Sequence, residues 1–92
     1  MSVFTINSEA LSFLKVTGGY DANKFDGACN IASKNDFLGY IPEGTTLSDT
    51  PKIYEDPSGT IKAPSGWYSN EIISRYWDND SGTFTSDMTC PL

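Results

Sequence analysis

The stretch from Gly66 to Cys90, GWYSNEIISRYWDNDSGTFTSDMTC, constrains the fold more than any other part of the chain. It places aromatic and β-branched residues, which favour strands, between runs of Asn, Asp, Ser and Gly, which favour turns. Short strands joined by tight turns are typical of an antiparallel meander. We therefore expect the chain to end in a β-meander whose last strand leads into a cysteine.

The same alternation of strand formers and turn residues extends upstream. Short apolar or aromatic runs recur, and Pro, Gly, Asp or Asn residues separate them. The candidate strands lie at residues 37–41, 52–55, 60–63, 67–68, 72–77 and 83–85. This spacing predicts an all-β fold, as a small antiparallel meander or sandwich.

The first 19 residues follow different patterns. Apolar and hydroxyl residues alternate over 2–6, which predicts a first strand. Ser8 is a candidate N-cap for a short apolar face that continues to Leu14, which predicts a turn or two of helix. Gly18 and Gly19 would end that helix.

The segment from Tyr20 to Asn30 is polar and rich in turn residues, and Asp26–Gly27 is its clearest turn signal. We interpret it as a connection between two parts of the chain. The sequence therefore predicts an N-terminal arm or docking segment over residues 1–28, in which a short helix can form. A β module over residues 29–92 would follow.

Cys29 and Cys90 are the only cysteines, and the chain has no histidine. A domain this small has a thin core, which usually needs a staple such as a disulfide. If the thiols pair, the closed loop would stabilise the fold by roughly 4 kcal/mol. The alternative is a cytosolic protein with two buried free thiols. Two thiols without imidazole match structural zinc poorly, so we expect no metal site of this kind.

Twelve acidic and six basic residues give a net charge of −6. Nucleic acids and anionic membranes are bound through clustered Lys and Arg, so we expect neither as a partner. No segment approaches the length that spans a bilayer, and residues 1–19 lack the pattern of a secretory leader. A disulfide without a leader fits a protein that is released by cell lysis, as many virus particles are.

The string IYEDPSGTIKAPSGWYSNEIISRYW, preceded by GTTL and followed by a terminal Cys, carries a resemblance. It resembles a cysteine-bounded small β module at the C-termini of Bacteroidetes surface proteins and of structural proteins of their phages. The resemblance covers Cys29 to Cys90, and its matched residues are Tyr54, Asp56, Thr60, Pro64, Gly66, Tyr68, Ser69 and Trp77.

The chain departs from that module at Asn70–Glu71, where the module has Asp-Gly. Glu adopts a left-handed conformation poorly, so we expect a longer loop in place of the tight type I′ turn.

Aromatic residues and the only arginine gather in the C-terminal meander. Strand alternation places Tyr76 and Trp77 on opposite faces, so at least one of them belongs to the core or to a subunit contact. The alternative is a sugar-binding platform, and Arg75 beside the rings is a candidate partner contact. The candidate binding or interface residues are Trp67, Tyr68, Arg75, Tyr76 and Trp77.

The run Asp78–Gly82 resembles the start of a calcium loop, but the later ligands of that loop are missing. We interpret the run as a hairpin turn and expect no metal and no cofactor. Without histidine, and with no cysteine in an activating motif, we expect that the chain is not an enzyme.

Two functions follow from these features. The first is a structural protein of a bacteriophage particle: a capsid-decorating, head-fibre or tail-associated subunit. It would reside in the virion and contact other virion proteins and copies of itself. The alternative is a module that recognises a host surface glycan or protein through exposed aromatic residues.

Overall fold

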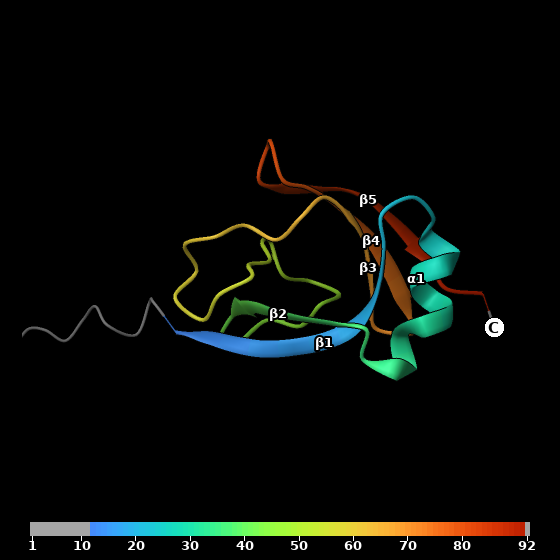
Figure 1. Cartoon of the computed structure of the whole chain (residues 1–92), viewed down its shortest axis with the longest axis horizontal. Helices are drawn as coiled ribbons and strands as arrows, with labels where there is room; N and C mark the ends of the chain where they lie inside the picture. Colours follow the sequence, from blue (N-terminus) through green and yellow to red (C-terminus); the bar gives the residue numbers. More distant parts are fainter. Residues whose placement is uncertain (1–11, 92) are drawn as a thin grey trace, which may run out of the picture.

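The computed structural model describes residues 12–91 and consists of a five-stranded antiparallel sheet with one short α-helix (Figure 1). The strand order is β2-β1-β3-β4-β5. The strands are β1 (Phe13–Asp21), β2 (Phe37–Pro42), β3 (Gly66–Ser69), β4 (Ile73–Asp78) and β5 (Thr83–Thr89). Between β1 and β2 lie helix α1 (Phe25–Ile31) and the 3-10 turn η2 (Ala32–Lys34). The expectation of a small, mostly antiparallel β fold is confirmed.

Strand β1 joins the two halves of the sheet. Its first part pairs with β2, from Phe13 opposite Pro42 to Gly18 opposite Phe37. Its last three residues pair with β3, ending with Asp21 opposite Trp67. Residues 13–21, which the sequence assigns to the N-terminal arm, therefore form an internal strand of the same sheet as β2 and β3.

The helix predicted to run from Ser8 and end at Gly18 and Gly19 is replaced by strand from Phe13 onward. Both glycines lie where β1 changes partners. A Cβ atom on Gly19 would stand 1.9 Å from the carbonyl oxygen of Ala28 in α1, and one on Gly18 would stand 2.2 Å from that of Ser69. The glycines thus permit close packing of backbone on backbone. The strand predicted over residues 2–6, and Ser8 itself, lie outside the described residues.

The turn predicted at Asp26–Gly27 is wrong, because both residues lie in α1. Asp21 prepares the helix start: its Oδ1 accepts hydrogen bonds from the N–H groups of Asn23 and Lys24, at 2.8 and 3.0 Å. These bonds hold the pKa of Asp21 below its usual value. A Cβ on Gly27 would stand 2.1 Å from Asp21 Oδ2, so a residue that looks like a turn signal serves a tertiary contact.

The hydrophobic core lies on the face of the sheet that is opposite α1. Figure 1 shows α1 beside the β3–β5 half of the sheet, with the long segment of residues 43–65 folded over the rest. Apolar residues of that segment pack against strand residues of β2, β3 and β4. The buried cluster consists of Ile41, Leu47, Ile53, Ala63, Tyr68 and Trp77, and Val16, Tyr20, Phe37 and Phe84 pack against it.

The strands predicted at 52–55 and 60–63 are reduced to isolated bridges, in which Tyr54 pairs with Tyr40 and with Lys62. Prolines flank both segments and cannot donate to a ladder, which limits pairing to these points. Tyr54 and Tyr40 still exchange two backbone hydrogen bonds of 2.8 and 2.9 Å. The outer edge of β2 is therefore partly covered.

The connection between β3 and β4 comprises only residues 70–72, and Asn70 N–H donates to the Ile73 carbonyl at 3.3 Å across it. The turn is therefore tight, and the longer loop expected from Asn70–Glu71 is not formed. Glu71 has φ of 82°, in the left-handed region that Glu adopts poorly. Asn70 Oδ1 accepts hydrogen bonds from the N–H groups of Ile72 and Ile73, both at 3.0 Å. The next connection is the predicted hairpin turn at 78–82, closed by Gly82 N–H donating to the Asp78 carbonyl at 2.8 Å.

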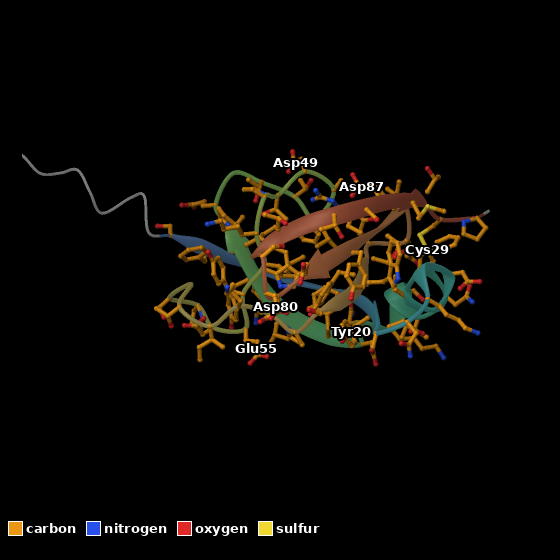
Figure 2. All side chains as sticks on the ribbon, turned by 90° about the horizontal axis from the view of Figure 1, so that it is seen from above. Tyr20, Cys29, Asp49, Glu55, Asp80 and Asp87 are labelled. Carbon is orange, nitrogen blue, oxygen red and sulfur yellow. A yellow bond between two sulfur atoms is a disulfide. The ribbon has the colours of Figure 1, made fainter. Side chains whose placement is uncertain are left out.

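Cys29 and Cys90 form a disulfide with a Cα–Cα distance of 5.7 Å. The bond joins α1 to the residue that follows β5, and Figure 2 shows its sulfur atoms beside the helix. The two cysteines are therefore paired, and the alternative of two buried free thiols is wrong. It closes a loop of 61 residues across the domain.

Candidate functional site

The aromatic residues expected to bind a partner are divided between the two faces of the sheet. Trp77 is fully buried, and its Nε1 donates to the Ala63 carbonyl at 2.8 Å. Tyr68 is 2% exposed, and its hydroxyl donates to the Pro64 carbonyl at 2.7 Å. Both residues therefore belong to the core, the alternative role that the sequence allows for them.

Trp67 and Tyr76 lie on the other face, next to α1. Both are half-buried, and their ring centroids stand 5.4 Å apart with the planes inclined at 69°. Phe25 of α1 packs on Trp67 in the same edge-on manner, at 5.9 Å. Rings in this arrangement do not present a common flat surface, so these three residues are a poor platform for a sugar ring.

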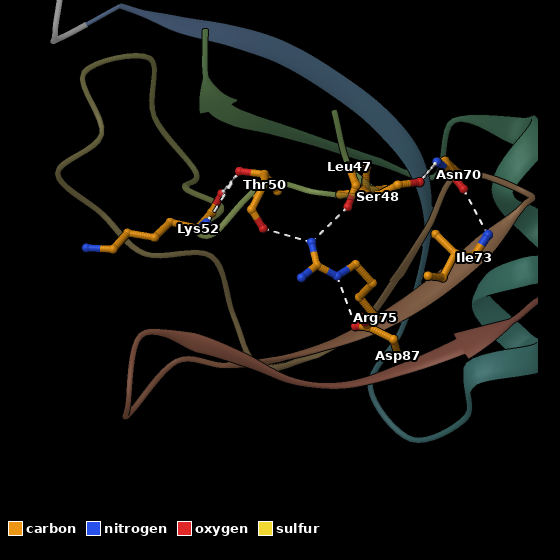
Figure 3. Close-up of polar contacts among 8 residues, drawn as sticks. All are labelled: Leu47, Ser48, Thr50, Lys52, Asn70, Ile73, Arg75 and Asp87. Carbon is orange, nitrogen blue, oxygen red and sulfur yellow. Dashed lines mark hydrogen bonds and ion pairs between the residues drawn. The ribbon is translucent and has the colours of Figure 1, made fainter. Parts of the chain in front are cut away.

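Arg75 fixes the segment of residues 43–65 to the sheet (Figure 3). Its Nη1 donates to the carbonyls of Leu47 and Thr50, at 3.2 and 2.7 Å, and its Nε contacts Asp87 Oδ1 at 3.0 Å. The guanidinium lies 4.1 Å above the ring centre of Phe84. The planar fork of Arg suits this combination of carbonyls, carboxylate and ring. Arg75 therefore has a structural role within the chain.

A recess in the surface lies between β1, β2, β3 and the segment of residues 53–64. Its volume is about 280 Å³, and four aromatic rings contribute to its wall. The lining residues are Tyr20, Phe37, Leu38, Gly39, Ile53, Tyr54, Glu55, Ala63, Pro64 and Tyr68. We call this recess the tyrosine pocket.

The tyrosine pocket has one charged side chain in its wall, and it is the acidic Glu55. The hydroxyl of Tyr20 donates to the Ser65 carbonyl at 2.6 Å, which fixes its ring. Burial raises the pKa of Tyr68 above its usual value, and the carboxylate of Glu55 raises it further. Figure 2 shows Tyr20 and Glu55 on the same side of the molecule. The Tyr68 hydroxyl therefore stays neutral at physiological pH, and Glu55 supplies the charge.

The outer edge of β5 is the second feature able to bind a partner. Cys90 N–H donates to the Ile72 carbonyl at 2.9 Å, so the alternation of an antiparallel ladder turns the N–H and C=O groups of Thr89 and Asp87 away from β4. Six of the seven residues of β5 are exposed. Unlike β2, which Tyr54 covers, β5 has no strand on its outer side within residues 12–91.

Within the described part of the chain, His, Cys, Asp and Glu side chains form no group of three that could hold a metal ion. The described helices also include none that is long and apolar enough to cross a membrane.

Comparisons of the chain with protein-family models, with curated proteins and with solved structures gave no match. The fold and the disulfide thus define the class of the protein: a small, disulfide-linked, mostly β domain. The resemblance to the cysteine-bounded phage and surface-protein module depends on the residues alone and stays a prediction.

The tyrosine pocket cannot be predicted from the sequence, because its residues come from separate parts of the chain. Tyr20, Phe37 and Tyr54 stand in three different segments, and none of them belongs to the aromatic-rich C-terminal stretch. Among the lining residues, only Tyr54, Pro64 and Tyr68 carry a signal, as matched positions of the resemblance. The open edge of β5 depends on strand order, which a single sequence leaves undetermined.

Proposed function

We propose that this protein is a structural subunit of a bacteriophage particle that acts through protein–protein contacts. The observation that carries the proposal is the open edge of β5. Its outward N–H and C=O groups at Thr89 and Asp87 form a template on which a strand of a neighbouring protein can add. A particle component needs contacts of this kind with copies of itself or with other virion proteins.

Two further features support the proposal. The disulfide between Cys29 and Cys90 stabilises a small domain for use outside the cell, where oxidised cysteines persist. The resemblance to a module of phage structural proteins extends over the same two cysteines. A capsid-decorating, head-fibre or tail-associated position is compatible with all of these features.

The direct test is mass spectrometry of purified particles of the phage that encodes the chain. We expect the protein in a fixed number of copies per particle, retained through washing at high salt. Its absence from particles, together with its recovery from the host lysate, would contradict the proposal.

A pair of proline variants then tests the role of the β5 edge. Thr89→Pro removes an outward N–H group and leaves the ladder to β4 in place, so we expect a folded protein that is no longer retained on particles. Met88→Pro removes an N–H group that faces β4 and should destabilise the fold. A Thr89→Pro protein that assembles normally would exclude strand addition at this edge.

A further inference from the structure

The tyrosine pocket has a size that suits a single side chain. Its volume of about 280 Å³ is at the low end of pockets that hold small molecules. Tyr54 forms part of the wall and is half-buried, and Phe13 packs against its ring with centroids 5.4 Å apart. Tyr20 and Tyr68 lie on the neighbouring strands β1 and β3, and their ring centroids are 4.9 Å apart. The recess is thus built from rings that other rings hold in place.

The charge of the pocket selects the kind of side chain. Glu55 is an exposed residue in the wall, and the only ion pair within residues 12–91 joins Arg75 and Asp87. The carboxylate of Glu55 therefore has no cation beside it among the described residues. The chain as a whole has a net charge of −6, which adds a long-range attraction for basic partners.

Aromatic rings and a carboxylate together suit a cation that has an apolar stem. The face of a tyrosine ring attracts a guanidinium or ammonium group, and the methylene groups of the same side chain cover apolar surface. A neutral sugar would satisfy the rings but would leave the charge of Glu55 without a counterpart.

We infer that the tyrosine pocket receives an arginine or lysine side chain from a neighbouring protein, with the charged group beside Glu55 and the stem against Tyr54. The inference depends on the proposed function only for the statement that the neighbour is a virion protein. Binding of the side chain itself is a property of the isolated domain. The pocket would thus select the partner, while the edge of β5 would supply backbone contacts.

The test is an NMR titration of the ¹⁵N-labelled, oxidised full chain with blocked tripeptides. The probes are acetyl-Gly-Arg-Gly-amide, acetyl-Gly-Lys-Gly-amide and the neutral acetyl-Gly-Gln-Gly-amide, with methyl glucoside as the sugar probe. We expect the basic peptides to shift the amide signals of Gly39, Ile53 and Glu55, with millimolar affinity that falls as salt is added. Equal shifts from the neutral peptide, or shifts from the glucoside alone, would overturn the inference.

A matched pair of variants locates the binding. Glu55→Gln keeps the size of the side chain and removes its charge, so we expect basic peptides to bind about three- to tenfold more weakly. Glu43→Gln removes an exposed carboxylate outside the pocket and should leave the affinity unchanged. Equal losses in both variants would mean that general attraction to an acidic protein, rather than the pocket, accounts for the binding.

The result is independent of the particle experiment. Basic peptides that bind at Glu55 while the chain is absent from particles would support the pocket and refute the proposed function. A chain present in particles whose pocket ignores basic peptides would refute the pocket inference alone.

Discussion

At the scale of single residues, Ser69 and Ser74 face each other across β3 and β4, and both are fully buried. Ser69 Oγ accepts a hydrogen bond from Glu71 N–H at 3.1 Å and lies 3.2 Å from the sulfur of Cys90. Ser74 Oγ has no hydrogen-bond partner among the described residues. Two chemically identical side chains on one rung of the sheet therefore have different energetic roles.

We expect Ser74→Ala to raise the free energy of unfolding by about 1 kcal/mol, because a buried hydroxyl without a partner costs roughly 1–3 kcal/mol. Ser69→Ala is the matched control. It should lower the free energy of unfolding by about 1 kcal/mol, because it removes the hydrogen bond that Ser69 Oγ accepts from Glu71 N–H. Urea titrations of both variants measure the two effects. A loss of stability in Ser74→Ala as large as that in Ser69→Ala would show that the Ser74 hydroxyl has a partner.

The carboxylate of Asp56 makes the stability of the turn after Tyr54 depend on pH. Its carboxylate accepts hydrogen bonds from the hydroxyls of Ser58 and Thr60 and from the N–H group of Ile61, and these bonds lower its pKa well below the usual value. A carboxyl group with a lowered pKa in the folded state stabilises the fold above the pKa of the unfolded chain, and this stability is lost as pH falls toward the folded pKa.

The pH dependence of unfolding tests this role. We expect the stability of the natural chain to decline as pH falls below about 4, the usual pKa range of Asp. Asp56→Asn should be less stable at neutral pH and should decline less steeply over the same acid range. Urea midpoints at several pH values give both curves. Parallel curves for the two proteins would contradict the role of Asp56.

At the scale of elements, sequence patterns identify the strands whose residues carry their own signal. Phe37–Pro42, Gly66–Ser69 and Ile73–Asp78 alternate strand formers and end at turn residues, and each appears near its expected position. The elements that sequence patterns miss are β1 and α1. There, Gly19 looks like a helix-ending residue and Gly27 looks like a turn residue. In the structure, another part of the chain lies so close to each glycine that a larger side chain would clash with it.

Arg75 is the most informative residue for the packing of elements, because it links β4 to the segment of residues 43–65. Its side chain is 12% exposed, whereas that of its ion-pair partner Asp87 is 52% exposed. The bonds to the carbonyls of Leu47 and Thr50 are therefore worth more than the exposed ion pair.

We expect Arg75→Lys to lower the free energy of unfolding by about 2 kcal/mol, because the fork that reaches two carbonyls is lost. Asp87→Asn should cost less than about 1 kcal/mol, as is typical of exposed ion pairs. Urea titration gives both values, and faster hydrogen exchange near Thr50 in Arg75→Lys would locate the effect. Equal costs would mean that Arg75 acts mainly through Asp87.

At the scale of the whole molecule, the disulfide joins helix α1 to the residue that follows strand β5. Sequence alone leaves the pairing of Cys29 and Cys90 open, because a thin core makes a staple desirable without showing that two cysteines meet. The fold brings their Cα atoms to 5.7 Å, since α1 packs on the face next to β3 and β4 and β5 ends beside it. The candidate site is harder to predict, because the tyrosine pocket exists only after β1, β2, β3 and residues 53–64 assemble.

Replacing both cysteines by alanine should lower the free energy of unfolding by roughly 4 kcal/mol, because the disulfide closes a loop of 61 residues. For a domain of this size the melting temperature should fall by roughly 15–30 °C. Calorimetry of the oxidised chain, the reduced chain and the double variant measures the effect. Equal melting temperatures for all three would show that the disulfide contributes little to the fold.

The most direct test of the account is hydrogen exchange at β5 in the free protein and in purified particles. The N–H groups of Thr89 and Asp87 face outward from the sheet, whereas the ladder to β4 protects those of Met88 and Ser86. We predict that assembly slows exchange at Thr89 and Asp87 and leaves Met88 and Ser86 protected in both states. Equally fast exchange of Thr89 and Asp87 in free protein and in particles would contradict a partner strand at this edge.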